Sequence, residues 1–157
     1  MLSAFIVLIF LIALTMWIGQ YLHDRHRVTD IKVFRLLIPY HFGIALVYYI
    51  YALYNRSDSQ GYYIKVIIDY RGDNWFDFYG VSTTFIEFIG YPFIKYLGFS
   101  YEASMILFAW FGLLGFYFFY IVLKERLTYT HTFLGFDLLW LVMFLPNLHF
   151  WSSSFGK

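Results

Sequence analysis

The 157-residue sequence contains no cysteine and only 3 prolines. The lack of cysteine excludes disulfide bonds, thiolate metal sites and cysteine nucleophiles. Charged side chains are also scarce, at 13% of the residues, against roughly a quarter in an average soluble domain. The formal net charge is +1, which gives no overall field that would attract nucleic acid. The composition therefore excludes an ordinary cytosolic domain and gives no sign of a nucleic acid partner.

Apolar residues are what the sequence has in quantity: 61% of the chain is hydrophobic and 26% is aromatic. A bilayer-crossing helix needs about 20 mainly apolar residues, and in hydrocarbon a helix satisfies all its backbone polar groups within one segment. We therefore expect an all-α polytopic membrane protein in which residues 1–157 form a single membrane-embedded unit. The four expected transmembrane helices cover about 2–22, 36–53, 101–123 and 133–150.

Two of these expected helices have informative details. The run 2–22 carries no charge and lacks the basic start and small-residue cleavage site of a signal peptide, which favours an uncleaved span over a cleaved leader. In the second run, Pro39 is expected near the helix start. N–H groups of the first turn have no intrahelical acceptor, so a proline there costs no hydrogen bond.

Basic residues indicate the sides of the membrane. Four fall in the short connection 25–35, and two more in 124–126 directly after the third expected span. Lysine and arginine in short loops mark the cytoplasmic side. The N-terminus, the C-terminus and the long loop 54–100 are then all expected outside.

The outer loop 54–100 is not plainly soluble. It contains two apolar runs, 62–68 and 85–97, which are too short and too charged to span a bilayer. Both are predicted to be interfacial or re-entrant helices with aromatic rings at headgroup depth. Gly90 and Pro92 are expected to break the second one.

Asp58 is the strongest candidate for chemistry. It lies in the string NRSDSQGYY, residues 55–63, where the second expected span emerges on the outer side. A carboxylate held there could act as a general base toward a sugar hydroxyl. The alternative is that the string is only a solvated turn.

A second acidic group, Asp69, Asp73 and Asp77, has hard oxygen ligands that could bind a divalent cation. Gly72 and Asn74 favour a turn over the single helix that would align all three carboxylates. The spacing does not match an EF-hand. These residues are therefore weak metal candidates, and an interfacial loop rich in aromatic residues is the alternative.

The histidines suggest no metal site, because only His23 and His26 are close in sequence and no third ligand is nearby. Ser152 to Ser154 are expected to be polar surface. Tyr62 and Trp75 are aromatic residues of the outer loop that could stack on a sugar ring.

The last segment, residues 145–157 (LPNLHFWSSSFGK), resembles the P-x-x-x-F-W-S-S-x-x-x-K stretch of bacterial polytopic glycosyltransferases and polysaccharide polymerases of the glycosyltransferase C type. The string DSQGYY and the amphipathic segments after it also look like the first outer loop of such enzymes. Those enzymes have many more spans, so the resemblance implies that this chain is an N-terminal fragment.

The resemblance implies an integral protein of a bacterial inner or plasma membrane that acts in cell-envelope glycan assembly. Its substrate would be a polyprenyl phosphate-linked sugar, used at the outer surface without a nucleotide sugar. Asp58 would be the catalytic base. Arg56, Lys65 or Lys157 would neutralise the phosphate leaving group through charge-assisted hydrogen bonds. The sequence points to no definite cofactor, and a divalent cation is compatible with this mechanism.

The alternative function is a small non-enzymatic membrane subunit that packs against a larger partner. Ala109, Gly112 and Gly115 give the third expected span an edge of small residues, which suits helix packing. A transporter or channel has less support, because the spans lack a series of ionisable residues through the bilayer centre.

Overall fold

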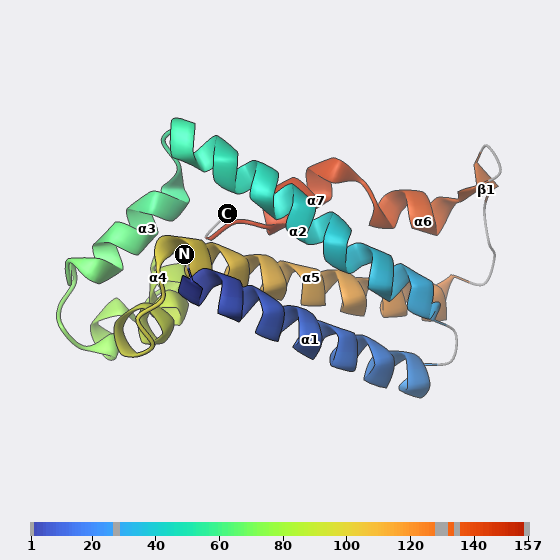
Figure 1. Cartoon of the computed structure of the whole chain (residues 1–157), viewed down its shortest axis with the longest axis horizontal. Coiled ribbons are helices and arrows are strands. Elements are labelled where there is room, and N and C mark those ends of the chain that lie inside the picture. The colour runs from blue at the N-terminus through green and yellow to red at the C-terminus, as the bar shows by residue number, and fades with distance from the viewer. Residues whose placement is uncertain (1, 27–28, 128–131, 134–135, 156–157) are drawn as a thin grey trace.

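The computed structural model describes residues 2–26, 29–127, 132–133 and 136–155, and within them the chain is helical apart from one short strand pair (Figure 1). The long helices are α1 (Leu2–Arg25), α2 (Ile31–Tyr54) and α5 (Tyr101–Arg126). The strands β1 (Thr132–Phe133) and β2 (Phe136–Asp137) pair antiparallel. The shorter helices are α3 (Asp58–Ile67), the 3₁₀-helix η1 (Trp75–Phe78), α4 (Thr83–Tyr91), the π-helix η2 (Pro92–Tyr96), α6 (Leu138–Met143) and α7 (Pro146–Ser152).

The three long helices have the length and composition of membrane spans. They contain 24, 24 and 26 residues, and their most apolar stretches have mean hydropathies of 2.2, 1.6 and 2.2. Large apolar side chains on them stay exposed, among them Phe10, Trp17 and Leu46. The prediction of an all-α fold is confirmed, and these three helices are long and apolar enough to cross a membrane.

Helix α2 begins earlier than the sequence predicted. Asp30 caps it, because its carboxylate accepts a hydrogen bond from the Lys32 backbone N–H at 2.8 Å. Pro39 therefore lies inside the helix and not at its start, and that prediction is wrong. Because proline has no backbone N–H, the helix lacks the hydrogen bond from residue 39 to the Arg35 carbonyl.

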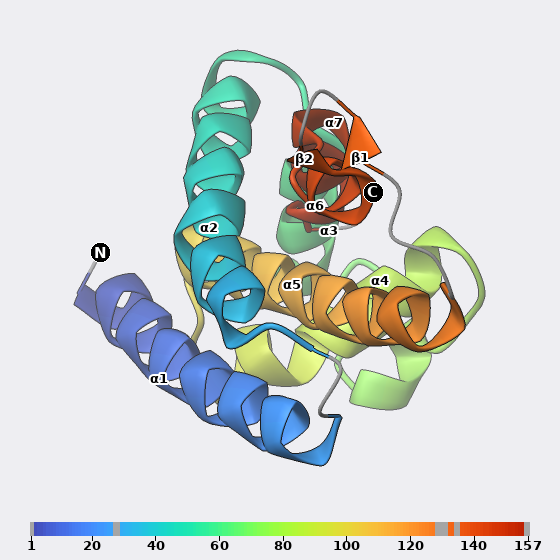
Figure 2. The same ribbon diagram turned by 90° about the vertical axis from the view of Figure 1, so that its right-hand side faces the viewer.

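Helix α5 packs against both α1 and α2, as the view along the bundle shows (Figure 2). Polar side chains join the helices. The Trp110 indole N–H donates to the Thr15 hydroxyl at 2.9 Å, and the Tyr117 hydroxyl donates to the Phe34 carbonyl at 2.8 Å. Interhelical hydrogen bonds of this kind help hold helices together where lipid is as apolar as the helix interface.

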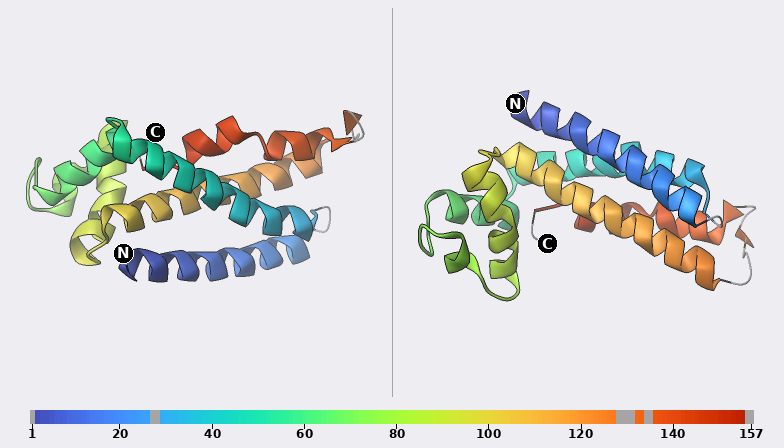
Figure 3. Two further views of the ribbon diagram at one scale, coloured as in Figure 1. Left: turned by 45° about the horizontal axis from the view of Figure 1, so that its top comes forward. Right: turned by 90° about the horizontal axis from the view of Figure 1, so that it is seen from below.

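The bundle has two different ends. The α1–α2 connection and the C-terminal end of α5 lie together at one end, and the N-terminus lies toward the other (Figure 3). At that second end, the shorter helices α3, η1, α4 and η2 form a layer that we call the cap. The two groups of basic residues thus share one end, as the topology prediction requires.

The fourth expected span, 133–150, is not one continuous helix. Asp137 accepts a hydrogen bond from the Leu139 N–H at 2.9 Å and caps α6, which ends at Met143. Pro146 then begins α7. Proline cannot donate a hydrogen bond to the preceding turn, so it starts a new helix there. The sequence predicts interruptions of this span at Asp137 and Pro146, and the structure has a helix start at each of them.

Gly112 is the contact point between α5 and α7. A Cβ atom at this position would lie 2.2 Å from the backbone oxygen of Ser152 and 3.4 Å from Nε2 of His41. At Gly115, three residues further on, a Cβ would meet nothing within 4 Å. One residue of the small-residue edge, Gly112, therefore lets the C-terminal segment approach α5 closely, while Gly115 faces open space.

We expect Gly112→Ala to destabilise the protein by about 1–3 kcal/mol, because a backbone oxygen must move to admit the methyl group. The measurement is thermal unfolding in detergent followed by circular dichroism. Gly115→Ala is the matched control and should leave stability unchanged or raise it by up to about 1 kcal/mol through helix propensity. Equal unfolding temperatures for the two variants would contradict the packing described here.

Candidate functional site

The cap and the segment leading into it contain the residues that the sequence singled out for chemistry, apart from Lys157. The two apolar runs of the outer loop form helices, α3 from the first run and α4 with η2 from the second. The second run was expected to break at Gly90 and Pro92; α4 passes through Gly90 and ends at Tyr91, and Pro92 begins η2. Gly90 instead makes room for the Phe155 ring, which lies 2.8 Å from where its Cβ would be.

Asp58 is the first residue of α3, and its side chain is exposed. Arg56, two residues before it, is exposed as well. Among the described residues, neither side chain is engaged in a hydrogen bond or an ion pair. Both charges are therefore available to a ligand at the same corner of the cap.

A chain of hydroxyl groups holds this corner in place. The Ser57 hydroxyl lies 3.1 Å from that of Tyr48 and 2.6 Å from that of Ser59, and the Ser59 hydroxyl lies 2.8 Å from that of Tyr101. The chain joins α2, α3 and α5. The side-chain amide of Gln60 also donates to the Ala52 carbonyl at 2.6 Å. These contacts fix the start of α3, and with it the position of Asp58.

Tyr62 lies one helical turn after Asp58 but is buried, with 8% of its surface exposed. Burial raises the pKa of its phenol, and the Asp58 carboxylate adds to the rise. Its ring packs edge-on against Phe155. The ring that was expected to stack on a sugar therefore packs inside the protein.

Trp75 is also engaged within the cap. Its indole N–H donates to the Phe88 carbonyl at 2.8 Å, and its ring stacks on the Phe88 ring with centroids 5.0 Å apart. One face of the Trp75 ring and its indole N–H therefore contact Phe88, which leaves only the other face for stacking on a sugar.

Glu87 is the electrostatic centre of the cap, and sequence reasoning did not select it. Its carboxylate is fully buried. It accepts hydrogen bonds from Lys65 Nζ at 3.1 Å and from Arg71 Nε at 2.8 Å. A charge inside the apolar run FIEFIGYPF was the available signal, because a buried carboxylate needs charged or hydrogen-bonding partners.

Lys65 was expected to bind phosphate, and the structure places its ammonium group on Glu87 and 5.5 Å from the centre of the Tyr62 ring. The positive charge of Lys65 is thus paired with the Glu87 carboxylate inside the cap. Lys157, the other lysine expected to bind phosphate, lies outside the described residues.

The three aspartates proposed as metal ligands serve separate local roles. Asp69 pairs with Lys95 at 2.7 Å. The Asp73 carboxylate accepts from the Asn74 side chain, and the Asp77 carboxylate accepts from the Asn74 backbone N–H, each at 3.1 Å. No group of three metal-ligating side chains occurs among the residues described in the structure.

The conformation of this segment explains the separation. Asp69 and Gly72 both have positive φ angles, 52° and 145°, and positive φ interrupts a right-handed helix. A Cβ at position 72 would lie 2.2 Å from an Asp77 carboxylate oxygen. The chain therefore forms a glycine turn there and not the helix that would align the carboxylates.

The serines of the FWSSS string were expected to be polar surface, and this expectation is wrong for two of them. Ser153 and Ser154 are 0% and 6% exposed. They lie in the segment between α7 and Phe155, which is drawn into the protein because Phe155 packs against Tyr62 and Phe108.

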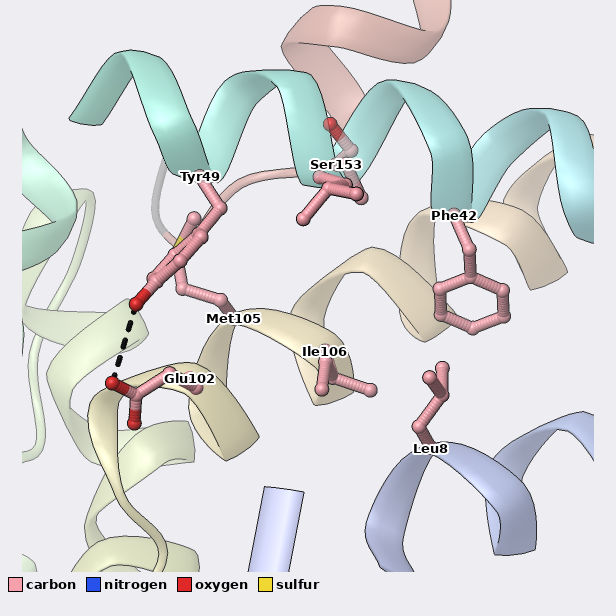
Figure 4. A pocket seen from close by; sticks show the side chains of 9 residues that line it. Leu8, Phe42, Tyr49, Glu102, Met105, Ile106 and Ser153 are labelled. Carbon is pink, nitrogen blue, oxygen red and sulfur yellow. Dashed lines mark hydrogen bonds between the residues drawn. The ribbon is translucent and has the colours of Figure 1, made fainter. Parts of the chain in front are cut away.

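A cavity of about 250 Å³ lies between α1, α2 and α5 (Figure 4). Its lining is mainly apolar and includes Leu8, Phe42 and Ile106. At one side the Tyr49 hydroxyl donates to a Glu102 carboxylate oxygen at 3.3 Å. Since Glu102 is in the first turn of α5, this side is the cap end of the bundle.

Comparison with known proteins adds no identification: no family model, no curated protein and no solved structure matches this chain. Within its described residues, the chain is a helical protein with three helices long and apolar enough to cross a membrane.

We expect Glu87→Gln to destabilise the protein by roughly 2 kcal/mol, because it leaves Lys65 and Arg71 facing a neutral amide. Their partial exposure to solvent keeps the loss below that of a fully buried pair. Glu125→Gln is the control, since the Glu125 carboxylate makes an exposed contact of 2.6 Å with the His26 ring. Unfolding in detergent is the measurement, and an equal effect of both substitutions would contradict a structural role for Glu87.

Proposed function

We propose that this chain is the membrane part of a glycosyltransferase or polysaccharide polymerase that uses a polyprenyl phosphate-linked sugar. The observation that carries the proposal is the exposed carboxylate of Asp58, two residues after the exposed guanidinium of Arg56, both without an ion pair among the described residues. This transfer needs a general base for the acceptor hydroxyl and a cation that neutralises the phosphate leaving group.

In the proposed reaction, Asp58 accepts the proton of an acceptor sugar hydroxyl. The hydroxyl oxygen attacks C1 of the donor sugar, and the bond between C1 and the phosphate oxygen breaks. The lipid phosphate leaves with the electron pair of that bond, and Arg56 neutralises its charge. Arg56 takes this role in preference to Lys65, because Lys65 is paired with Glu87.

The proposal also fixes an orientation. The end of the bundle with the basic residues is cytoplasmic, and the cap, the N-terminus and the C-terminal segment lie at the outer surface of a bacterial inner or plasma membrane. Helices α3 and α4 then lie at the headgroups, and α6 with α7 forms a fourth, broken membrane segment. The apolar cavity beside Glu102 lies below the cap, where a hydrocarbon chain of the carrier lipid fits its lining.

A second candidate function is a non-enzymatic subunit that packs against a larger membrane partner. It is favoured by one face of α5, where Gly115 has open space around it and Phe111, Phe118 and Phe119 are exposed. Such a face lets a partner helix approach closely.

We expect Asp58→Asn, introduced at the chromosomal locus, to lower the amount of glycan product at least 100-fold, the lower range for loss of a general base. Asp73→Asn is the matched control, because Asp73 is an exposed carboxylate of the same cap, and it should leave product unchanged. Protein abundance in the membrane is measured by immunoblot. Full product from Asp58→Asn would refute the role of this carboxylate.

The subunit function makes a different prediction. Gly115→Leu would disrupt co-purification with a membrane partner, because the bulky side chain fills the open surface of α5. If Gly115→Leu abolishes co-purification while Asp58→Asn leaves the glycan intact, the non-enzymatic function replaces the enzymatic one.

A further inference from the structure

The contact between α2 and α7 contains two histidines that are far apart in the sequence. His41 and His149 are both fully buried, and their Nδ1 atoms lie 2.7 Å apart. Nε2 of His41 lies 2.8 Å from the Ala109 carbonyl oxygen, and Nε2 of His149 lies 2.7 Å from the Met143 carbonyl oxygen. All four ring nitrogens therefore have a partner at hydrogen-bond distance.

These partners determine how many protons the pair holds. A carbonyl oxygen only accepts hydrogen bonds, so each Nε2 carries a hydrogen. A neutral imidazole has one N–H, so two neutral rings would place two lone pairs opposite each other at the Nδ1 atoms. A hydrogen bond at 2.7 Å needs a proton between those atoms. Hydrogen bonds at all three of these contacts would take three N–H groups, which gives the pair one positive charge.

The surroundings suit a buried cation. The Phe116 ring stacks on the His149 ring with centroids 4.0 Å apart and an interplanar angle of 7°, and it also contacts the His41 ring. The face of an aromatic ring attracts a cation. The carbonyl oxygens of Ala109 and Met143 add two acceptors for the outer N–H groups.

Other titratable groups near the pair are few. From α2, the Tyr40 ring contacts His149 edge-on, and its hydroxyl donates to the Phe144 carbonyl at 2.7 Å. From α5, the contacts are Ala109, Gly112 and Phe116, and from α6 the Met143 carbonyl. Within the described residues, no carboxylate, lysine or arginine is bonded to either ring.

A metal ion fits this geometry less well than a proton. Two nitrogen ligands on a tetrahedral zinc ion would lie about 3.3 Å apart, which is longer than the 2.7 Å between the two Nδ1 atoms. The described residues also provide no group of three ligands.

We propose that His41 and His149 form a buried site that binds one proton between their Nδ1 atoms, and that this proton holds α7 against α2 and α5. Its loss would leave two facing lone pairs and force the rings apart. Phe155, three residues after α7, packs against Tyr62 in the cap. The bound proton therefore also supports the packing of the cap, whether or not the proposed transferase activity is correct.

The first test is nuclear magnetic resonance of the protein in detergent micelles with ¹⁵N-labelled histidine rings. A shared proton gives a scalar coupling across the hydrogen bond between the two Nδ1 nuclei at about pH 6. We expect this coupling in the wild type and in His23→Gln, and its loss in His41→Gln. Two unprotonated Nδ1 atoms without coupling in the wild type would overturn the proposal.

The second test is thermal unfolding between about pH 6 and pH 9. The stability that the shared proton contributes is present at low pH and is lost as pH rises past its release. We expect the wild type and His23→Gln to lose roughly 5 °C in unfolding temperature, and His149→Gln to show no such loss. The same pH slope in His149→Gln, or destabilisation of the wild type by a metal chelator at constant pH, would overturn the proposal.

Discussion

The close approach of α7 to α5 at Gly112 is the constraint on which the C-terminal part of the structure depends. Only a residue without a side chain leaves room for the Ser152 carbonyl at that position. The approach brings His149 to His41 and carries Phe155 into the cap. This backbone contact thus adds a second connection between the long helices and the cap, besides the hydroxyl groups that join α2, α3 and α5.

The cap uses most of its charges for its own structure. Glu87 binds Lys65 and Arg71, and Asp69 binds Lys95. These pairs allow a mainly apolar loop to bury the Glu87 carboxylate with a cation on each of its two oxygens. Four exposed charges of the cap have no ion pair among the described residues: Arg56 and Asp58 at the start of α3, and Asp73 and Asp77, which accept hydrogen bonds from Asn74. Arg56 and Asp58 are the pair of opposite charges among them.

This arrangement places polar and apolar features side by side. The Ser59 hydroxyl beside Asp58 contacts Tyr101, and the next residue, Glu102, lines the cavity between α1, α2 and α5. A substrate with a charged head and a hydrocarbon tail could place its head at the Asp58 corner and its tail in the apolar cavity. The short path from the Asp58 corner to the apolar cavity is the structural basis of the carrier-lipid proposal.

The sequence by itself determined the helical class and the three helices that are long and apolar enough to cross a membrane, because long uncharged runs have few stable alternatives in lipid. It also located the cap helices and the turn at Gly72, which follow from local composition. Tertiary structure alone decided the Glu87 centre, the burial of Tyr62 and the meeting of His41 with His149. Those features join side chains that are up to 108 positions apart, and no local pattern of residues encodes which distant helix faces will touch.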